Sequence, residues 1–382
     1  MTHPIIQWTE NGHARKARWR SEAGTPPPER VEVADDRMTA DAAYGLATQG
    51  VALLWRGDFH QARQMLVALA SRADRHPRRK KGAPPKPTTF PDAFHAHRQA
   101  QAQRARTLSR LLVPFDRDYS IPLGRAPDVR EACLDAYGPG DAPSVASLRD
   151  LQGMIGAYEW RSAGIEIHEA GGRIHPHYGI FAPVRREYIG LVATAPMPDA
   201  CKEDCVAFDI GTGTGVLAAV LAKRGFARVI ATDLDARAIA CARDNVAQLG
   251  FGNRVEVVEA NLFPPGRAHL VVCNPPWIPA RPSSPVEQGI YDFESGMLRG
   301  FLNGLVEHLE PGGEGWLILS DLAEHLKLRS RDELLGMIDA AGLRVVDRMD
   351  TKPRHPKASD TKDPLHVARA AEVTSLWRLA AT

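Results

Sequence analysis

The sequence lacks any apolar run that could cross a membrane. Its longest strictly apolar stretch, Val216–Ala222, is far shorter than the ~20 residues that a spanning helix needs. The first residues, Met-Thr-His-Pro, have neither the basic start nor the apolar core of a signal peptide. We therefore expect a cytoplasmic protein with no membrane partner.

Cysteine is scarce as well, and the five cysteines follow no framework spacing. Cys201 and Cys205 form a lone C-x3-C motif, whereas a zinc site of this kind needs a second pair nearby. His168, His175 and His177 also lack a Cys, Asp or Glu at ligand spacing. The pattern therefore indicates unpaired thiols in a reducing compartment and no bound metal.

A large excess of charge is absent, because 48 Lys and Arg residues face 46 Asp and Glu residues for a formal net charge of +2. The chain as a whole is therefore no polycation. The distribution is uneven: residues 1–160 hold 23 basic and 18 acidic residues, and residues 161–382 hold 25 and 28. Two basic segments, 75–86 and 352–362, are interpreted either as solvated surface or as contacts for a partner such as ribosomal RNA.

The N-terminal part of the chain has a polar first segment, which is followed by residues with helical periodicity. Residues 1–36 show no sustained period, so we expect an irregular segment. Helical periodicity begins near Thr39 and continues to Trp160, with a stop at Gly138-Pro-Gly140. This predicts a mostly helical N-terminal domain over residues 37–163, with a basic, proline-rich linker at residues 75–91.

The pattern changes at Gly164. Short strands on either side of Gly171-Gly172 predict a β-hairpin. After Pro198, apolar strands alternate with helical stretches; the strands are expected at Val206–Ile210, Arg228–Asp233, Val255–Glu259, His269–Cys273, Gly315–Ser320, Val345–Asp350 and Val373–Leu379. Residues 164–382 are therefore predicted to form the hairpin and an α/β domain with a mostly parallel, Rossmann-like sheet of seven strands.

A glycine loop joins the first of these strands to a helix, in the segment Asp209-Ile-Gly-Thr-Gly-Thr-Gly215. Glycines let a ligand approach the backbone closely, and the helix N-terminus offers unpaired N–H groups. Asp233 ends the second strand, where a carboxylate can accept both hydroxyls of a ribose. The dinucleotide fingerprint would need glycine where Val216 stands, so a nucleotide fold with another ligand stays open.

A second motif, Asn274-Pro-Pro-Trp277, follows a buried strand at the edge where open α/β sheets bind ligands. Pro275 and Pro276 have no N–H and a fixed φ, so the carbonyls of Asn274 and Pro275 are expected to point outward. A planar NH2 group fits there: one N–H reaches the Asn274 side-chain oxygen, the other reaches the Pro275 carbonyl, and Trp277 stacks on the plane. The alternative is that two prolines simply end the strand.

The residue types suit a reaction at a weakly nucleophilic nitrogen. An amide or aromatic amine has its lone pair delocalised, and acceptors that hold both hydrogens out of the plane favour a pyramidal nitrogen. The same acceptor dipoles stabilise the positive charge that develops on nitrogen. Alignment of two bound reactants supplies much of the remaining acceleration.

The two motifs resemble those of the class I S-adenosyl-L-methionine (SAM) dependent methyltransferases. The glycine loop is similar to their first motif, and Asp233 is similar to their ribose-binding acid. The resemblance implies SAM as cofactor and a sheet whose last strand is antiparallel. It also implies cofactor-binding roles for Asp209, Gly211, Thr212, Gly213, Gly215, Asp233 and, near the adenine amine, Asn261.

The tetrad narrows the resemblance to enzymes that methylate planar nitrogens. These are the HemK-like glutamine N5-methyltransferases of release factors and ribosomal proteins, and the adenine N6 and guanine N2 enzymes of nucleic acids. Gly179-Ile-Phe-Ala-Pro183 with Glu187 looks like the segment before the first motif in the HemK-like group. The tetrad here ends in Trp rather than the commoner Tyr, and the N-terminal region is longer than that group's helical domain.

The resemblance therefore implies a methyltransferase whose acceptor is held by Asn274, Pro275, Pro276 and Trp277. The preferred acceptor is a glutamine side chain of a protein partner, either a translation factor or a ribosomal protein. The alternatives are a base in ribosomal RNA or DNA, a small metabolite, and a SAM-binding module without turnover.

Overall fold

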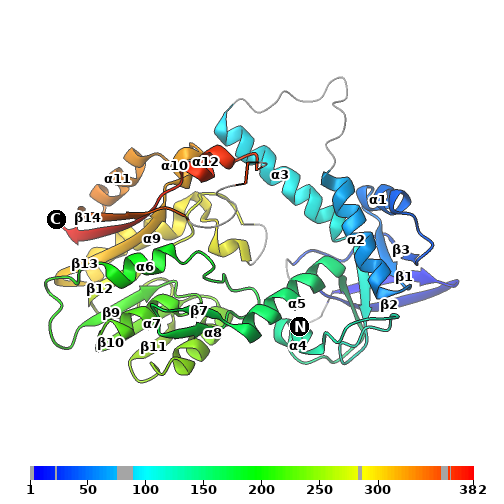
Figure 1. Ribbon diagram of the computed structural model, residues 1–382, viewed down its shortest axis with the longest axis horizontal. Helices are drawn as coiled ribbons and strands as arrows, with labels where there is room; N and C mark the ends of the chain where they lie inside the picture. Colours follow the sequence, from blue (N-terminus) through cyan, green and yellow to red (C-terminus); the bar gives the residue numbers. More distant parts are fainter. Residues whose placement is uncertain (1–3, 22–23, 75–88, 283–285, 354–359, 362) are drawn as a thin grey trace. The chain divides into compact units, whose positions relative to one another are not determined.

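The structure is a computed structural model that describes residues 4–21, 24–74, 89–282, 286–353, 360–361 and 363–382. Contacts between Cα atoms divide the chain into two units, one of residues 1–88 with 95–159 and one of residues 89–94 with 160–382. Each unit has a β-sheet of its own (Figure 1). The first unit therefore has a sheet that the sequence pattern did not predict.

The sheet of the first unit has the strand order β1-β2-β6-β5-β4-β3. Its strands are β1 (Ile5–Glu10), β2 (His13–Trp19), β3 (Val31–Ala34), β4 (Ala52–Trp55), β5 (Leu111–Phe115) and β6 (Ser144–Ser147). Strands β3, β4 and β5 run parallel to one another, whereas β1 pairs with β2 and β5 with β6 in antiparallel fashion.

The interpretation of residues 1–36 as irregular is wrong, because three of these strands lie in that segment. Strands β1 and β2 form a hairpin around Asn11 and Gly12, which have φ angles of 52° and 76°. An Asn-Gly pair takes such angles readily, and its twist matches that of the two strands. The charged side chains of β2 lie in a largely exposed strand, so the alternation of apolar and polar residues is weak there.

The expected helices of residues 37–163 are present: α1 (Ala40–Thr48), α2 (Phe59–Asp74), α3 (Phe90–Leu108), α4 (Arg130–Tyr137) and α5 (Leu148–Ala163). They accompany β4, β5 and β6, whose residues are all buried. One face of the sheet packs through a cluster that includes Ile6, Trp19 and Leu54. Most of the predicted linker at 75–91 lies outside the described residues, and α3 begins inside its last part at Phe90.

The second unit has the predicted α/β sheet, with the strand order β11-β10-β9-β12-β13-β15-β14. Its strands are β9 (Val206–Ile210), β10 (Arg228–Asp233), β11 (Val255–Glu259), β12 (Ala268–Cys273), β13 (Leu309–Ser320), β14 (Leu343–Thr351) and β15 (Thr374–Ala381). Strand β15, the last along the chain, is antiparallel to both of its neighbours, and the other pairings are parallel. The seven-stranded, Rossmann-like fold with an antiparallel last strand is confirmed.

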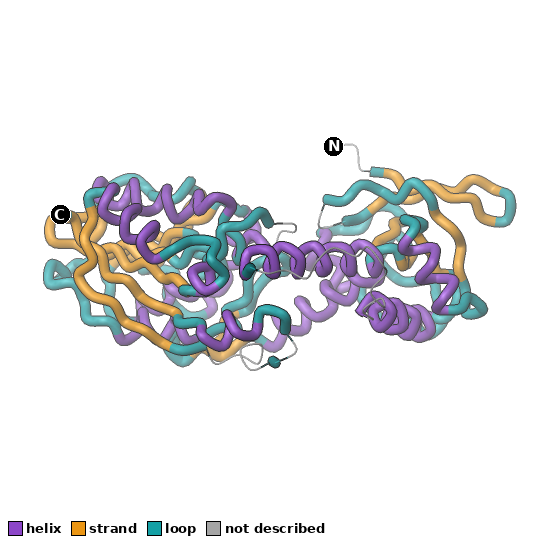
Figure 2. Tube along the Cα trace, turned by 90° about the horizontal axis from the view of Figure 1, so that it is seen from above, coloured by secondary structure: helices purple, strands orange, loops and turns teal. Residues whose placement is uncertain are grey.

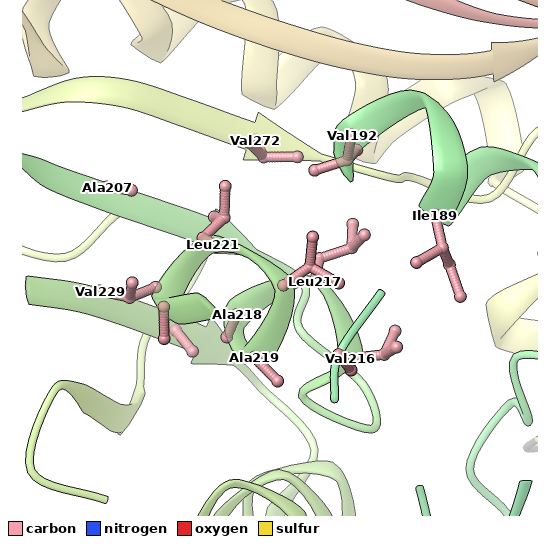
Figure 3. Close-up of a cluster of buried hydrophobic side chains, with 14 of the residues drawn as sticks. Ile189, Val192, Ala207, Val216, Leu217, Ala218, Ala219, Leu221, Val229 and Val272 are labelled. Carbon is pink, nitrogen blue, oxygen red and sulfur yellow. The ribbon is translucent and has the colours of Figure 1, made fainter. Parts of the chain in front are cut away.

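Helices cover both faces of this sheet, and Figure 2 shows the strands lying between them. Helices α6 (Glu187–Thr194), α7 (Val216–Lys223) and α8 (Ala236–Gln248) pack on one face, and α9 (Gly296–His308) and α11 (Arg331–Ala340) on the other. On the first face, Figure 3 shows Leu221 of α7 close to Ala207 of β9. Strand β9 is therefore buried on both sides, which gives the loop after it a rigid base.

The predicted hairpin is also present, formed by β7 (Ile165–Ile167) and β8 (Gly172–Ile174) in antiparallel pairing. One expectation about cysteine is wrong, because Cys201 and Cys205 are joined by a disulfide bond. The two residues flank a short turn just before β9, so their side chains come close without any long-range fold contact. Across the described ranges, no helix has the length and apolar character needed to cross a bilayer.

Candidate functional site

The glycine loop lies at the carboxyl end of β9, between that strand and α7. Gly211, Gly213 and Gly215 all have positive φ, at 70°, 56° and 79°. A Cβ atom on Gly211 would lie 2.5 Å from Cε of Met297, and one on Gly215 would lie 3.1 Å from Cα of Ala242. A Cβ on Gly213 would meet no atom within 4 Å. Gly213 therefore faces open space, Gly215 packs tightly against Ala242, and a side chain at Gly211 would displace the end of the Met297 side chain.

Asp209 and Thr212 lie beneath this loop and shape it from inside. Asp209 is 1% exposed, and its Oδ2 accepts hydrogen bonds from Thr212 Oγ1 at 2.6 Å and from the Ala218 N–H at 3.0 Å. Burial raises the pKa of Asp209 to about 6, although the two hydrogen bonds act in the opposite direction. Because both side chains point inward, we expect them to hold the loop against α7, with the ligand on the loop's other side.

Asp233, at the end of β10, faces the loop from the neighbouring strand. Its Oδ2 accepts the Gly213 N–H at 3.0 Å, and its Oδ1 accepts the Asp235 N–H at 3.0 Å. A carboxylate has about four acceptor positions, so each oxygen keeps capacity for a further donor. Asn261 follows β11 and is exposed, and the N–H of the preceding Ala260 donates to the Asp233 carbonyl at 3.1 Å. Three strand ends thus bring these residues to one edge of the sheet.

The tetrad begins where β12 ends, and β12 is the strand next to β9 on the other side. Cys273 pairs with Ile210, so the tetrad and the glycine loop start side by side. This position is the topological switch point of the sheet, since the strand order reverses between β9 and β12. Open α/β sheets bind their ligands in the crevice at such a point. The two predicted motifs are therefore brought together.

Within the tetrad, Trp277 Nε1 donates a hydrogen bond to Asn274 Oδ1 at 2.9 Å. The indole also packs against apolar clusters on both faces of the sheet and against a third cluster around Ile278, Leu322 and Leu326. Pro275 between them is buried. The first and last residues of the tetrad are thus coupled directly, a contact that the spacing alone did not predict.

Two charged residues beside the tetrad were missed by the sequence analysis. The guanidinium of Arg185 lies over the Trp277 ring, 4.7 Å from its centroid, and Arg185 Nη1 donates to Glu372 Oε1 at 2.9 Å. Arg185 lies between Pro183 and Glu187, which both belong to the segment singled out before the first motif, but Arg185 itself was not predicted to have a role. Glu372 follows α12 (His366–Ala371) in the chain, and no motif marks it.

A third missed residue, Asn245 of α8, connects the glycine loop to the strand β8. Its Oδ1 accepts the N–H of His175 at 2.7 Å, and its Nδ2 donates to the Thr214 carbonyl at 3.0 Å. Asn245 is fully buried. A polar residue at a helical position that should face the core was the available signal, because Ala238 and Ala242 precede it on the same buried face.

Comparison with known proteins identifies the part of the chain that carries the loop and the tetrad. Residues 191–335 match the family model of the methyltransferase small domain. Over these residues the chain is similar to the methyltransferase small domain. The resemblance to class I SAM-dependent methyltransferases, predicted from the two motifs, is confirmed by this match.

Two curated relatives are similar to part of this chain. The release factor glutamine methyltransferase of Cereibacter sphaeroides is 32% identical over 173 residues, which cover 42% of this chain and 58% of that protein. The tRNA1(Val) (adenine(37)-N6)-methyltransferase of Bacteroides thetaiotaomicron is 31% identical over 127 residues, which cover 31% of this chain and 54% of that protein. The chain thus spans little more than half the length of either relative.

Among solved structures, a methyltransferase from Pyrococcus furiosus is 18% identical, covers 60% of this chain and 98% of its own, and gives a TM-score of 0.40.

Proposed function

We propose that this protein transfers a methyl group from SAM to a planar nitrogen, and that its preferred acceptor is a glutamine side chain of a protein. The observation that carries the proposal is the position of Asn274 and Trp277. They are hydrogen-bonded to each other at the end of β12, beside the glycine loop at the end of β9. A donor site and an acceptor site at one switch point suit direct transfer between two bound molecules.

The residues of the loop fit SAM. Gly213 leaves the backbone open to a ligand, and Asp233 keeps acceptor capacity for the two ribose hydroxyls. Gly211, Gly213 and Gly215 would support the methionine part, and Asn261 would accept from the adenine amine. Asp209 and Thr212 would act on the loop from beneath. SAM supplies an electrophilic methyl group when it is bound.

The tetrad would hold the acceptor nitrogen. Asn274 Oδ1 accepts the indole N–H with one of its two lone pairs. The other lone pair can accept one hydrogen of an incoming NH2 group. The Pro275 carbonyl would accept the second hydrogen, and Trp277 would stack on the amide plane. Pro276 fixes the backbone between them. These acceptors stabilise the positive charge that grows on nitrogen, and the proton can leave after transfer.

The charge of the catalytic part favours a protein acceptor over a nucleic acid. Residues 161–382 hold 25 basic and 28 acidic residues, a balance of −3. A nucleic-acid substrate typically needs basic side chains to neutralise phosphates. The relative with the longer overlap is named a release factor glutamine methyltransferase. The basic excess of residues 1–160 and the tRNA-adenine relative keep an RNA base as the second candidate.

The test is to supply tritiated SAM to a cell extract with the purified protein and to treat the product with protease or nuclease. Label released by protease, and found as methylated glutamine after hydrolysis, supports the proposal. Label released by nuclease would show that the acceptor is a nucleic-acid base and not glutamine. Label in small molecules would show that the acceptor is a metabolite. SAM binding in calorimetry without any transfer would instead favour a binding module.

The variant Asn274→Ala tests the tetrad within the same assay. Transfer should fall by orders of magnitude while SAM affinity stays nearly unchanged, because the side chain acts on the acceptor alone. Asn303→Ala, at an exposed position of α9, is the matched control and should transfer at the wild-type rate. Wild-type turnover in Asn274→Ala would remove the tetrad from the mechanism.

A further inference from the structure

The orientation of the Asn274 carboxamide depends on Trp277. An indole N–H only donates, so it must face the oxygen of the carboxamide and not its NH2 group. If the indole moved away, the Asn274 side chain could rotate and present NH2 to the acceptor, which would repel a second NH2 group. A residue that fixes the position of the indole therefore also determines which end of the Asn274 carboxamide faces the acceptor.

The flat guanidinium of Arg185 holds the indole from one face, 4.7 Å from the ring centroid. Arginine stacks on aromatic rings better than lysine because its charge is spread over a plane. That face of the ring is therefore covered by Arg185.

Arg185 is itself fixed by two buried carboxylates. Its Nε donates to Glu187 Oε1 at 2.9 Å and its Nη1 donates to Glu372 Oε1 at 2.9 Å. The side chains of Glu187 and Glu372 are 5% and 0% exposed. Removing one partner from buried charges of this kind is strongly destabilising, whereas an apolar replacement of the whole group often is not. Stability alone therefore gives little reason for this arrangement.

The network is anchored on the sheet. Ser320 Oγ donates to Glu372 Oε1 at 2.5 Å, and Ser320 is the last residue of β13. Its pairing partner Thr374 begins β15, two residues after Glu372. A connected path of polar contacts thus runs from two paired strand ends through Glu372, Arg185 and Trp277 to Asn274.

We propose that Arg185 is a positioning residue of the methyl-acceptor site, which acts by holding Trp277 so that Asn274 presents its oxygen to the acceptor nitrogen. The proposal rests on the proposed function, because it assigns Arg185 to the same transfer reaction. Arg185 does not act on SAM, so its loss affects the use of the acceptor and leaves the cofactor site intact.

The kinetic test uses Arg185→Lys, with purified bacterial release factor as the methyl acceptor and calorimetry for SAM. Lysine keeps the charge but cannot stack flat or bridge both carboxylates, so kcat should fall about tenfold or more with SAM affinity unchanged. The triple variant Arg185→Gln with Glu187→Gln and Glu372→Gln removes both carboxylate charges that the loss of Arg185 alone would leave buried and unpaired, and it should show the same loss. Wild-type kcat and KM in both variants would overturn the proposal.

The matched control is Arg331→Gln. The Arg331 guanidinium lies 5.1 Å from the centroid of the Trp377 ring and pairs with Glu324 at 2.7 Å, an arrangement of the same kind away from the tetrad. This variant should have wild-type kcat and KM. A loss equal to that of Arg185→Lys would show a general effect on the fold and would also overturn the proposal.

A second readout needs no acceptor. In protein with 15N-labelled tryptophan, the indole N–H signal of Trp277 is assigned from its absence in Trp277→Phe. In Arg185→Lys this signal should shift and exchange faster with solvent, whereas it should stay in place in Arg331→Gln. An unchanged signal in Arg185→Lys would refute the positioning role even if the wild-type protein transferred no methyl group. A protein that shows the shift but binds no SAM would refute the proposed function alone.

Discussion

The indole N–H of Trp277 donates to Asn274 Oδ1 at 2.9 Å, so the last residue of the tetrad orients the first. A tyrosine at this position would carry a hydroxyl that both donates and accepts, and that can therefore face either end of the carboxamide. The donor-only indole allows a single orientation. A tetrad that ends in Trp instead of Tyr is thus compatible with binding an NH2 group. The Trp also fixes the orientation of the Asn274 carboxamide.

The variant Trp277→Phe tests the N–H group apart from the aromatic ring. The phenyl ring keeps a stacking surface, but the Asn274 carboxamide loses its fixed donor and is free to flip. We expect kcat to fall roughly tenfold, with a smaller loss than in Asn274→Ala and with SAM affinity unchanged. Steady-state transfer with the acceptor found in extract measures this effect. A wild-type kcat in Trp277→Phe would mean that the hydrogen bond has no part in turnover.

Asp233→Ala should weaken SAM binding. The side chain carries the proposed ribose contact and also accepts the Gly213 N–H at 3.0 Å, so its loss affects both ligand and loop. We expect a loss of about 1.5–3 kcal/mol in binding free energy, measured by titration calorimetry. Asp235→Ala is the control, because Asp235 caps α8 through the Arg237 N–H and should cost stability without changing SAM affinity. Equal SAM affinity in the two variants would contradict the role of Asp233.

Asp209→Asn should alter the pH dependence of stability. Folding raises the pKa of Asp209 from 3.8 to about 6 through burial, so the folded chain binds this proton more tightly than the unfolded chain. The stability that this group contributes is therefore complete below pH 3.8 and is lost as the pH rises through about 6, by on the order of 3 kcal/mol. The amide stays neutral and still accepts from Thr212 and Ala218.

The comparison is made by urea unfolding of both proteins between about pH 4 and about pH 8. Relative to the wild type, Asp209→Asn should gain free energy of unfolding as the pH rises. Two curves that stay parallel over this range would show that Asp209 does not titrate there. Asp235→Asn, at an exposed position, serves as the control for the change of a carboxylate to an amide.

The fold of the second unit was predictable because its strands are short apolar runs with clear ends. Strand β12, for example, is bounded on its carboxyl side by Asn274 and two prolines, which cannot continue a ladder. The first unit was harder, since β4 and β5 are buried throughout and show no alternation. Runs of four or five apolar residues cannot be told from a buried helix segment by period alone. The β1–β2 hairpin did have a local signal, because the pair Asn11-Gly12 favours a tight turn between two strands.

The site was predictable where its residues are neighbours in sequence and not where tertiary contacts assemble it. The glycine loop and the tetrad are local motifs, so their spacing indicated their chemistry. Arg185 and Glu372 are 187 positions apart, and nothing in either segment marks the other as a partner. Asp209 and Thr212 were predicted to bind the cofactor, and residue type could not reveal that both side chains point inward beneath the loop.

Comparing Gly213→Ala with Gly250→Ala should distinguish an effect on ligand binding from an effect of backbone strain. Gly213 and Gly250 both have positive φ, 56° and 78°, and an added Cβ meets no atom within 4 Å at either position. Each change to Ala should therefore cost about 1–2 kcal/mol of stability through the left-handed backbone alone. Only Gly213 lies where the proposed ligand contacts the loop, so Gly213→Ala should also lose about tenfold or more in SAM affinity. Calorimetry that gives both variants the wild-type affinity would place SAM elsewhere, and an equal loss in both would trace the effect to strain in the fold.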